Sequence, residues 1–423
     1  MSHVAVIGAG YVGLTTSAYL AHLGHDVVCA DVVPDKVEGL QRGEVPIFEV
    51  GLEELVRQGL DGHRLSFVLG AAGAVERAEF VFLCVPTPQG EDGTADMRYI
   101  EEAARDIGPH LRSEAVVINK STVPIGSTWV VEQALGRDDV FVVSNPEFLR
   151  EGSAVHDCLH PDRLVIGSDD QAAAIRVASL FEGIEAPLIV TDPASAETIK
   201  YASNAFLATK VSFVNALANL CEAVGADVRE VVLGMGYDRR IGFEFLRPGP
   251  GWGGSCFPKD TRALVHISDQ AGYDFALLRG VIAVNDEQYE RVTGKIERMA
   301  GGTLGGSTVA VWGLTFKART DDTRQSPALE VVHRLRERGA AVRAYDPQAS
   351  VHVDGIERCS DPYAACEGAA VLAVLTEWDD FRWLDLDKVR DLMAEPRIVD
   401  ARNLLDPAVL RRKGFAYEGV GRP

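Results

Sequence analysis

The N-terminal segment of this chain reads as a strand, a glycine-rich turn, a helix and a second strand, and it constrains the fold more than any other feature. The apolar residues 3–7 are followed by Gly8-Ala9-Gly10-Tyr11-Val12-Gly13 and by a helical pattern over residues 12–22. The glycines let a pyrophosphate approach the positive end of the helix. Asp31, at the end of the next strand, can accept hydrogen bonds from ribose hydroxyls and repel a 2′-phosphate. The segment predicts a dinucleotide site that prefers NAD to NADP; a tight strand–helix turn without a ligand is the alternative.

Further apolar runs predict parallel sheets in two regions of the chain. Runs at residues 80–85, 115–119 and 140–144 alternate with helical stretches, and residues 308–313 start a second series with runs at 341–344, 371–375 and 397–399. Between them, apolar residues recur at helical spacing over residues 194–236. We expect an α/β fold with two Rossmann-like, doubly wound domains (residues 1–195 and 301–423) joined by a central helical domain with a long helix (residues 196–300).

Composition narrows the classes of partner. The 423 residues carry a formal charge of −20, which argues against nucleic acid and anionic membrane surfaces as partners. No apolar run approaches the ~20 residues of a membrane span, and the first strand begins too early for a signal peptide. The seven cysteines form no Cys-x-x-Cys pair, so we expect neither a metal site nor a disulfide framework. A cytoplasmic location is expected.

One cysteine stands in an unusual setting, Gly253-Gly254-Ser255-Cys256-Phe257-Pro258-Lys259. A helix is expected to open at Lys259 and Asp260, and a thiol at a helix N-terminus beside a lysine ionises more easily. A thiolate can attack a carbonyl and hold the product as a thioester. A nucleophilic Cys256 and a structural Cys256 are equally supported by these residues alone.

Two further pairs are candidates for proton and oxyanion chemistry. Lys200 and Asn204 share a helix face, where they could stabilise an oxyanion; a solvated helix face is the more common explanation for such a pair. Glu147 and Glu151 lie on one side if a helix begins in their segment. Glu147 is then either a general base for water or an acid interacting with the helix dipole.

Taken together, these segments resemble the nucleotide-sugar dehydrogenases, most closely the branch that oxidises UDP-glucose. The resemblance covers nearly the whole chain and rests on GAGYVGL, VPTP, KSTVPIGST, NPEFLREGSA, KYASNAFLA, GGSCFPKD, GLTFKARTDDTR and DARN, in that order. It implies an NAD-dependent four-electron oxidation of the C6 alcohol to a carboxylate, through a cysteine thiohemiacetal and thioester. It also implies that the first domain binds NAD, the central one carries the cysteine and the last binds the UDP-sugar. The apolar surface of the long central helix predicts a homodimer or higher oligomer, with a domain core as the alternative.

The resemblance also assigns roles to residues. Cys256 is the expected nucleophile; Lys200 and Asn204 stabilise oxyanions; Asp260 and Thr122 organise water and proton transfer; Glu147 is the base or acid. The cofactor residues it implies are Gly8, Gly10, Tyr11, Val12, Gly13, Asp31, Lys36, Val85, Pro86, Thr87, Pro88, Thr122, Glu151, Lys259 and Arg324. The substrate residues it implies are Glu147, Phe148, Leu149, Arg150, Glu151, Lys200, Asn204, Arg240, Phe245, Leu246, Arg247, Gly253, Phe316, Lys317 and Arg402, with Arg240 reaching across a dimer.

The chain departs from the family pattern at two places that are expected to touch the sugar-nucleotide pocket. Trp252 replaces a smaller aromatic residue behind a loop stiffened by Pro250, and Ala318 stands where a proline often follows the lysine. Ser255, in place of histidine, argues against the N-acetylhexosamine branches. A GDP-mannose or other UDP-hexose dehydrogenase, a two-electron hydroxy-acid dehydrogenase and a non-catalytic NAD-binding sensor or scaffold are the alternatives.

Overall fold

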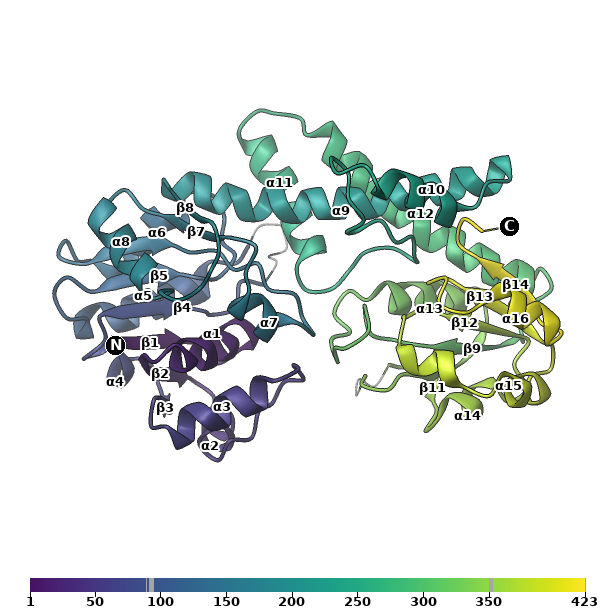
Figure 1. The fold of residues 1–423 in the computed structure, drawn as a ribbon, viewed down its shortest axis with the longest axis horizontal. Coiled ribbons are helices and arrows are strands. Elements are labelled where there is room, and N and C mark those ends of the chain that lie inside the picture. The colour runs from purple at the N-terminus through teal and green to yellow at the C-terminus, as the bar shows by residue number, and fades with distance from the viewer. Residues whose placement is uncertain (89, 91–94, 350–352, 423) are drawn as a thin grey trace. The chain divides into compact units, whose positions relative to one another are not determined.

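The computed structural model describes residues 1–88, 90, 95–349 and 353–422. The chain divides into two compact units, the first formed by Met1–Ser203 with Arg262–Gln270 and the second by Asn204–Thr261 with Ala271–Pro423. Helices α9 (Pro193–Val224) and α11 (Phe257–Gln270) therefore each contribute residues to both units (Figure 1). Among the described residues, no helix has the length and apolar character needed to cross a membrane.

The first unit is built on an eight-stranded sheet with the order β3-β2-β1-β4-β5-β6-β7-β8. Neighbouring strands are parallel except for β6 and β7, which pair antiparallel through Ser144 and Gly167. The central strands are apolar along their length because helices cover both faces. The strands are β1 (His3–Ile7), β2 (Asp26–Asp31), β3 (Leu65–Leu69), β4 (Phe80–Leu83), β5 (Val116–Asn119), β6 (Phe141–Ser144), β7 (Leu164–Gly167) and β8 (Leu188–Thr191).

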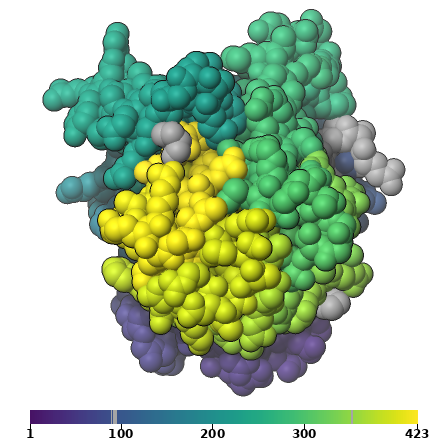
Figure 2. Space-filling view, turned by 90° about the vertical axis from the view of Figure 1, so that its right-hand side faces the viewer, coloured from purple at the N-terminus to yellow at the C-terminus, as the bar shows by residue number. Residues whose placement is uncertain are grey.

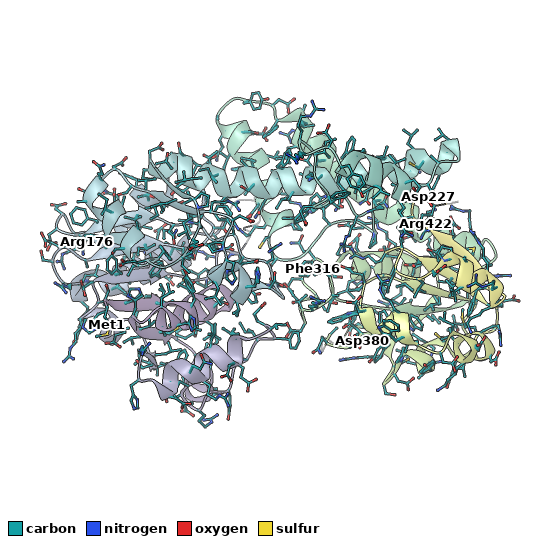
Figure 3. The ribbon with its side chains drawn as sticks, viewed as in Figure 1. Met1, Arg176, Asp227, Phe316, Asp380 and Arg422 are labelled. Atoms are coloured by element: carbon teal, nitrogen blue, oxygen red, sulfur yellow. The ribbon has the colours of Figure 1, made fainter. Side chains whose placement is uncertain are left out.

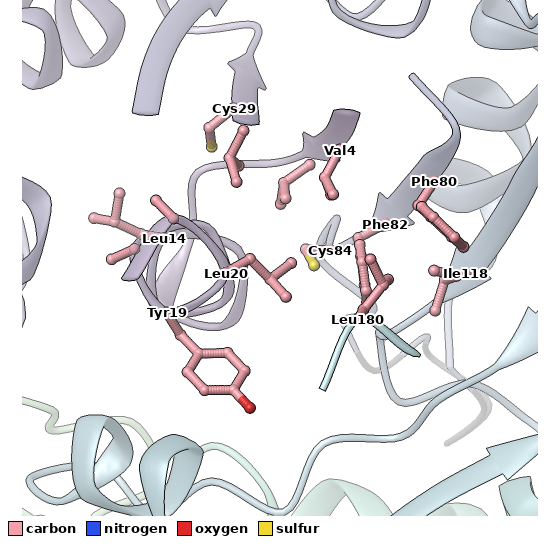
Figure 4. Packing of buried hydrophobic residues seen from close by; sticks show 14 of the residues in the cluster. Val4, Leu14, Tyr19, Leu20, Cys29, Phe80, Phe82, Cys84, Ile118 and Leu180 are labelled. Atoms are coloured by element: carbon pink, nitrogen blue, oxygen red, sulfur yellow. The ribbon is translucent and has the colours of Figure 1, made fainter. Parts of the chain in front are cut away.

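Helices pack two apolar clusters against this sheet. One cluster joins residues of α1, α2, α3 and α8 to one face, and Figure 4 shows part of it, with Leu20 of α1 between Leu14 and Phe82. The other joins α4, α5 and α6 to the opposite face. The helices are α1 (Tyr11–His22), α2 (Pro34–Gln41), α3 (Leu52–Asp61), α4 (Ala72–Val75), α5 (Arg98–Ile107), the 3₁₀ turn η1 (Gly108–His110), α6 (Ser127–Leu135), α7 (Ala154–Leu159) and α8 (Gln171–Ser179).

The second unit contains an all-parallel, six-stranded sheet with the order β11-β10-β9-β12-β13-β14. Its strands are β9 (Thr308–Trp312), β10 (Ala341–Tyr345), β11 (Ile356–Arg358), β12 (Val371–Val374), β13 (Arg397–Asp400) and β14 (Ala416–Gly419). Its helices are α10 (Val228–Gly236), α12 (Ala276–Met299), α13 (Pro327–Glu337), α14 (Pro362–Cys366), η2 (Asp379–Trp383), α15 (Leu386–Leu392) and α16 (Pro407–Arg412). The two parallel sheets confirm the predicted α/β architecture.

The C-terminal segment is tied to the helical part of the second unit. Helix α12 packs against α13 and β13, and the green and yellow segments adjoin in the space-filling view (Figure 2). Arg422 lies 3.6 Å from Asp227, at the start of α10, and both are labelled in Figure 3. The backbone N–H of Gly421 also donates to Glu222 of α9 at 2.6 Å. These contacts make residues 204–236, α12 and the second sheet one packed body.

Candidate active site

The glycine-rich turn after β1 fits a dinucleotide pyrophosphate. Gly8 has a φ of +100°, and a Cβ there would lie 2.8 Å from the Cys84 carbonyl oxygen. A Cβ on Gly13 would lie 1.8 Å from the Gly8 carbonyl oxygen, so the helix must approach the turn closely. Gly10, by contrast, is exposed and a Cβ there would meet no atom within 4 Å. Two glycines are thus required by packing, and the third leaves open space at the N-terminus of α1 for a bound phosphate.

Asp31 ends β2 beside this turn. Its Oδ2 accepts hydrogen bonds from the Ala9 N–H at 2.9 Å and from the Lys36 ammonium at 2.8 Å. Burial raises the pKa of Asp31, but the hydrogen bonds from Lys36 and from the Ala9 and Val33 N–H groups outweigh it and hold that pKa below its ordinary value. The carboxylate is therefore an anion beside the turn, as recognition of ribose hydroxyls requires.

The loops after β4 and β5 are joined by side-chain hydrogen bonds. The Thr87 hydroxyl donates to the Thr122 carbonyl at 2.8 Å, and the Ser121 hydroxyl donates to the Val85 carbonyl at 2.7 Å. Pro86 and Pro88 are exposed on the same segment. The structure thus brings Val85–Pro88 and Thr122 together at the carboxyl edge of the sheet, where ligands bind in open α/β sheets.

Glu147 and Lys200 form a buried ion pair. The Lys200 ammonium donates to Glu147 Oε1 at 2.6 Å, and the Leu149 N–H donates to Oε2 at 2.6 Å. The two side chains are only 4% and 6% exposed, so the solvated helix face that is more usual for such a lysine is wrong for Lys200. Burial raises the pKa of Glu147, but the charge and hydrogen bond of Lys200, the Leu149 N–H and the charge of Lys120 together hold it below its ordinary value.

The segment that carries Glu147 is a loop and not a helix. Helix α7 begins only at Ala154, so the expectation that Glu147 and Glu151 share a helix side is wrong. Pro146 keeps the preceding residue extended, and the Glu147 carboxylate bonds back to its own loop, which supplies an alternative to helical bonding. Phe148, on the same loop, stacks under the guanidinium of Arg163 with 3.7 Å between Cζ and the ring centroid.

In the second unit, Asp260 is completely buried between two donors. Its Oδ2 accepts from the Asn204 amide at 2.6 Å, and its Oδ1 accepts from the Lys259 ammonium at 2.7 Å. Asn204 is 7% exposed, which excludes a solvated helix face at this position as well. Because Lys200 and Asn204 are four residues apart in α9, one face of a continuous helix carries both polar anchors.

Cys256 immediately precedes α11, which begins at Phe257 rather than at Lys259 as expected from the sequence. Its half-buried thiol lies 3.5 Å from the Ser255 hydroxyl. The glycines before it are required by packing: a Cβ on Gly253 would lie 2.0 Å from the Gln325 carbonyl oxygen, and one on Gly254 would lie 2.9 Å from the Phe316 ring. The loop that presents the thiol is therefore fixed against the second sheet's domain.

Trp252 is a core residue rather than a pocket wall, which corrects the expectation that it touches the sugar. Its side chain is buried, and its indole N–H donates to the Ser212 hydroxyl of α9 at 2.8 Å. Its backbone exchanges hydrogen bonds with Asn285 of α12 at 2.8 and 3.0 Å, and its carbonyl accepts from the Tyr289 hydroxyl. The larger aromatic ring thus fills space between α9 and α12.

The basic residues expected to bind the diphosphate, Arg247, Lys317 and Arg402, all lie in the second unit. Arg402 donates to the Phe316 carbonyl at 2.9 Å and pairs with Glu377 at 3.0 Å, so these residues of the second unit are brought together. Arg247 is exposed, and Leu246 beside it is buried. Four further candidates in this unit have local partners: Arg240 pairs with Asp238, Arg324 pairs with Asp322, Lys317 lies over the Phe316 ring and Phe245 packs near Phe257, the residue after Cys256.

Three ionic residues of the first unit, buried Glu49 and Glu197 and half-buried Lys120, were missed in the sequence. Glu49 accepts the N–H groups of Gly152 and Ala154. Glu197, on α9, accepts the N–H groups of Gly126 and Thr128 at the start of α6. The ammonium of Lys120 donates to the Asn145 side chain at 3.0 Å, and burial lowers its pKa. Each forms hydrogen bonds to backbone N–H groups or to a side chain that lies far away in the sequence. The local spacing of residues does not predict such contacts.

Five of the other six cysteines are more enclosed than Cys256. Cys29, Cys84, Cys221, Cys359 and Cys366 are buried, and Cys158 is half-buried. Burial raises the pKa of each of these six thiols, to about 12 for Cys29, Cys158 and Cys366. Five of these six thiols are therefore core residues.

Comparison with known proteins matches successive parts of one family along the chain. Residues 2–185 match the NAD binding domain of the UDP-glucose/GDP-mannose dehydrogenase family, residues 194–287 its central domain and residues 310–407 its UDP binding domain. The chain is 43% identical to UDP-glucose 6-dehydrogenase TuaD of Bacillus subtilis strain 168, over 100% of this chain and 94% of the relative. It is 44% identical to a UDP-glucose 6-dehydrogenase of Rhizobium meliloti strain 1021, over 99% of both chains.

Solved structures agree with this match. A UDP-glucose dehydrogenase from the hyperthermophilic archaeon Pyrobaculum islandicum has a TM-score of 0.93 and 38% identity, covering 100% of this chain and 98% of its own. A UDP-D-ManNAc dehydrogenase from Pyrococcus horikoshii has a TM-score of 0.88 and 28% identity, covering 99% of both. With its NAD-binding turn, its buried polar anchors and its full-length relatives, the chain belongs to the UDP-glucose/GDP-mannose dehydrogenase family and is an NAD-dependent dehydrogenase.

Proposed function

We propose that the chain oxidises UDP-glucose at C6 to UDP-glucuronate, using two NAD for each sugar. The observation that carries the proposal is the full-length similarity, at 43–44% identity, to proteins that are UDP-glucose 6-dehydrogenases. The presentation of Cys256 on a loop fixed by Gly253 and Gly254 supports it, because a two-electron dehydrogenase has no need for a nucleophilic thiol.

The protein's own groups have distinct tasks in this reaction. When bound, NAD accepts a hydride from the sugar C6 in each of the two oxidations. We assign to Lys200 and Asn204 the stabilisation of negative charge on the C6 oxygen. The Cys256 thiolate forms a C–S bond to the aldehyde carbon, which gives a thiohemiacetal whose oxidation leaves a thioester. Asp260, held between Asn204 and Lys259, orients the amide that faces the substrate oxygen.

Hydrolysis of the thioester requires a base and a water molecule. Glu147 is the base in this proposal, because its lowered pKa keeps it ionised at neutral pH. It removes a proton from water, the hydroxide oxygen bonds to the thioester carbon, and the C–S bond breaks to return the Cys256 thiolate. Thr122 orders this water. The other cofactor and substrate residues implied by the family resemblance line the NAD and UDP-sugar sites in this proposal.

Turnover stoichiometry tests the proposal. Purified protein is incubated with UDP-glucose, GDP-mannose and UDP-N-acetylglucosamine in separate reactions, and NADH formed per sugar consumed is measured. Two NADH per UDP-glucose are expected, with Cys256→Ser inactive in acid formation and Cys158→Ser, the matched control thiol, active. One NADH per sugar, or full turnover by Cys256→Ser, refutes the thioester route; activity only with another sugar nucleotide refutes the substrate.

We also propose that the chain forms a homodimer through α9. Phe206, Phe213 and Leu220 recur every seven residues on this helix and are 65%, 53% and 56% exposed, as is Val224 at 66%. An apolar stripe of this length on one helix of a water-soluble protein is typical of a subunit interface. Sedimentation of Phe213→Glu is expected to show monomer, while Trp383→Glu, which changes an isolated aromatic residue that is 85% exposed, keeps the dimer. A dimeric Phe213→Glu variant contradicts the proposal.

The division of labour along the chain completes the proposal. Residues 1–195 bind NAD, residues 196–300 carry Cys256 and the dimer helix, and residues 301–423 bind the UDP moiety; the boundaries of the matched family domains support this. The expected location is the cytoplasm, where nucleotide sugars and a reducing environment for Cys256 are both available.

A further inference from the structure

A buried carboxylate links the dinucleotide turn to the loop that carries Glu147. Glu49 lies before α3 and is 7% exposed. Its Oε2 accepts a hydrogen bond from the hydroxyl of Tyr11, the first residue of α1, and another from the Gly152 N–H at 2.6 Å. Its Oε1 accepts from the Ala154 N–H at 2.9 Å. Three donors from two distant segments of the chain thus converge on one side chain.

The two segments have different expected ligands. Tyr11 belongs to the turn that fits a pyrophosphate, and Gly152 and Ala154 end the loop on which Glu147 is paired with Lys200. That loop is held at its middle by the hydrogen bond from the Arg150 N–H to Asp157 at 2.8 Å. Glu49 fixes its end, where Gly152 has a φ of +81°. Burial and the contact with Glu49 raise the pKa of the Tyr11 phenol, so its hydroxyl remains a donor at any working pH.

We propose that Glu49 is a positioning residue through which occupancy of the dinucleotide turn changes the affinity of the Glu147 loop for the sugar nucleotide. The inference rests on the proposed function. A cofactor seated at the turn restrains Tyr11, and a restrained Tyr11 fixes the Glu49 carboxylate that holds Gly152 and Ala154. Less conformational entropy of the loop is then lost when the sugar nucleotide binds, so each ligand increases the affinity for the other.

Two variants remove different hydrogen bonds to the Glu49 carboxylate. Glu49→Gln replaces one acceptor oxygen by an NH₂ group, so either the Gly152 or the Ala154 N–H faces another donor. Tyr11→Phe removes one hydroxyl and leaves both N–H bonds to Glu49 possible. Glu44→Gln is the matched control, because Glu44 lies on the same segment, its side chain is 64% exposed and its partner is Arg42.

The measurement is the dissociation constant of UDP-glucose, by calorimetry, with and without saturating NADH, a pair of ligands that cannot react. In the wild type and Glu44→Gln, NADH is expected to tighten UDP-glucose binding about fivefold or more. In Tyr11→Phe that ratio is expected to fall to about one. In Glu49→Gln, UDP-glucose binding in the presence of NADH is expected to weaken about tenfold, or ~1.4 kcal/mol.

If Glu49 only stabilised the fold, the ratio of the UDP-glucose dissociation constants without and with NADH would be the same in the variants as in the wild type. This ratio therefore distinguishes a positioning role from a structural one. An unchanged ratio in Tyr11→Phe, or a ratio of one in the wild type, overturns the inference. If Glu49→Gln fails to fold, Tyr11→Phe alone carries the test. If the wild type binds GDP-mannose but not UDP-glucose, the proposed substrate is wrong, and the same ratio measured with GDP-mannose decides the role of Glu49.

Discussion

Replacing Lys200 by methionine removes the cation from the most enclosed ion pair of the first unit. Because the side chains of Lys200 and Glu147 are 4% and 6% exposed, water screens neither charge. In Lys200→Met, the Glu147 carboxylate keeps the Leu149 N–H at 2.6 Å but loses its nearest positive charge. Breaking a buried pair from one side costs ~3–5 kcal/mol, and we expect a loss of this size in the free energy of unfolding of the first unit.

The double variant Lys200→Met/Glu147→Gln separates the buried charge from packing. It removes both charges of the pair, and the glutamine oxygen can still accept the Leu149 N–H. Since replacing both partners of a buried pair is often nearly neutral, its loss should be ~1 kcal/mol or less. Urea denaturation followed by circular dichroism, with hydrogen exchange of peptides from residues 141–159, measures both. The reasoning is refuted if Lys200→Met unfolds at the same urea concentration as the wild type, or if the double variant is the less stable of the two.

Three further changes test other parts of the structure. Trp252→Phe loses the hydrogen bond to Ser212 and leaves a small cavity, so it should lower the free energy of unfolding by ~2–3 kcal/mol. The ratio of UDP-glucose to GDP-mannose turnover should stay constant. A changed turnover ratio at constant stability would place the indole in the pocket. Gly253→Ala should lower kcat at least tenfold, because the added Cβ displaces the Cys256 loop from the Gln325 carbonyl. Gly73→Ala is the control, because a Cβ at Gly73 meets no atom within 4 Å. Equal kcat values in the two variants would contradict the packing argument. The depressed pKa of Glu147 contributes stability that is fully present above its ordinary value of 4.5 and is lost as the pH falls through the folded-state pKa. The free energy of unfolding, measured as the pH is lowered, should therefore fall less steeply in Glu147→Gln than in the wild type. Identical pH profiles of the two proteins would exclude this contribution.

Local patterns predicted the parts of the fold where one physical requirement decides the residues. The turn Gly8–Gly13 and the buried strands β1 and β4–β6 follow from glycine geometry and continuous apolar runs. Strands β3 and β8 were missed because they are the two edge strands of the sheet and carry exposed residues in place of a continuous apolar run. Strands of this kind are fixed by their pairing partners, which a local pattern does not contain.

The candidate site divides in the same way. Helical spacing predicted that Lys200 and Asn204 share a face, but their burial depends on Glu147 and Asp260, which lie 53 and 56 residues away. The family resemblance named Glu147 and Asp260 as site residues but not as the partners of Lys200 and Asn204, and spacing alone favoured a solvated face. Trp252 shows the converse error, since a departure from the family pattern suggested a pocket wall and the structure places it between two helices.

The raised pKa values of six thiols give the protein a practical property. Alkylating reagents react with thiolates, and at neutral pH the raised pKa values leave Cys29, Cys158 and Cys366 almost entirely protonated; Cys29 and Cys366 are buried as well. A short exposure to iodoacetamide should therefore label Cys256 first, giving one adduct per intact chain. Unfolding exposes the other six thiols to the reagent. In a mass spectrum of the alkylated protein, chains with one adduct therefore carry a reactive Cys256, and chains with more adducts are misfolded.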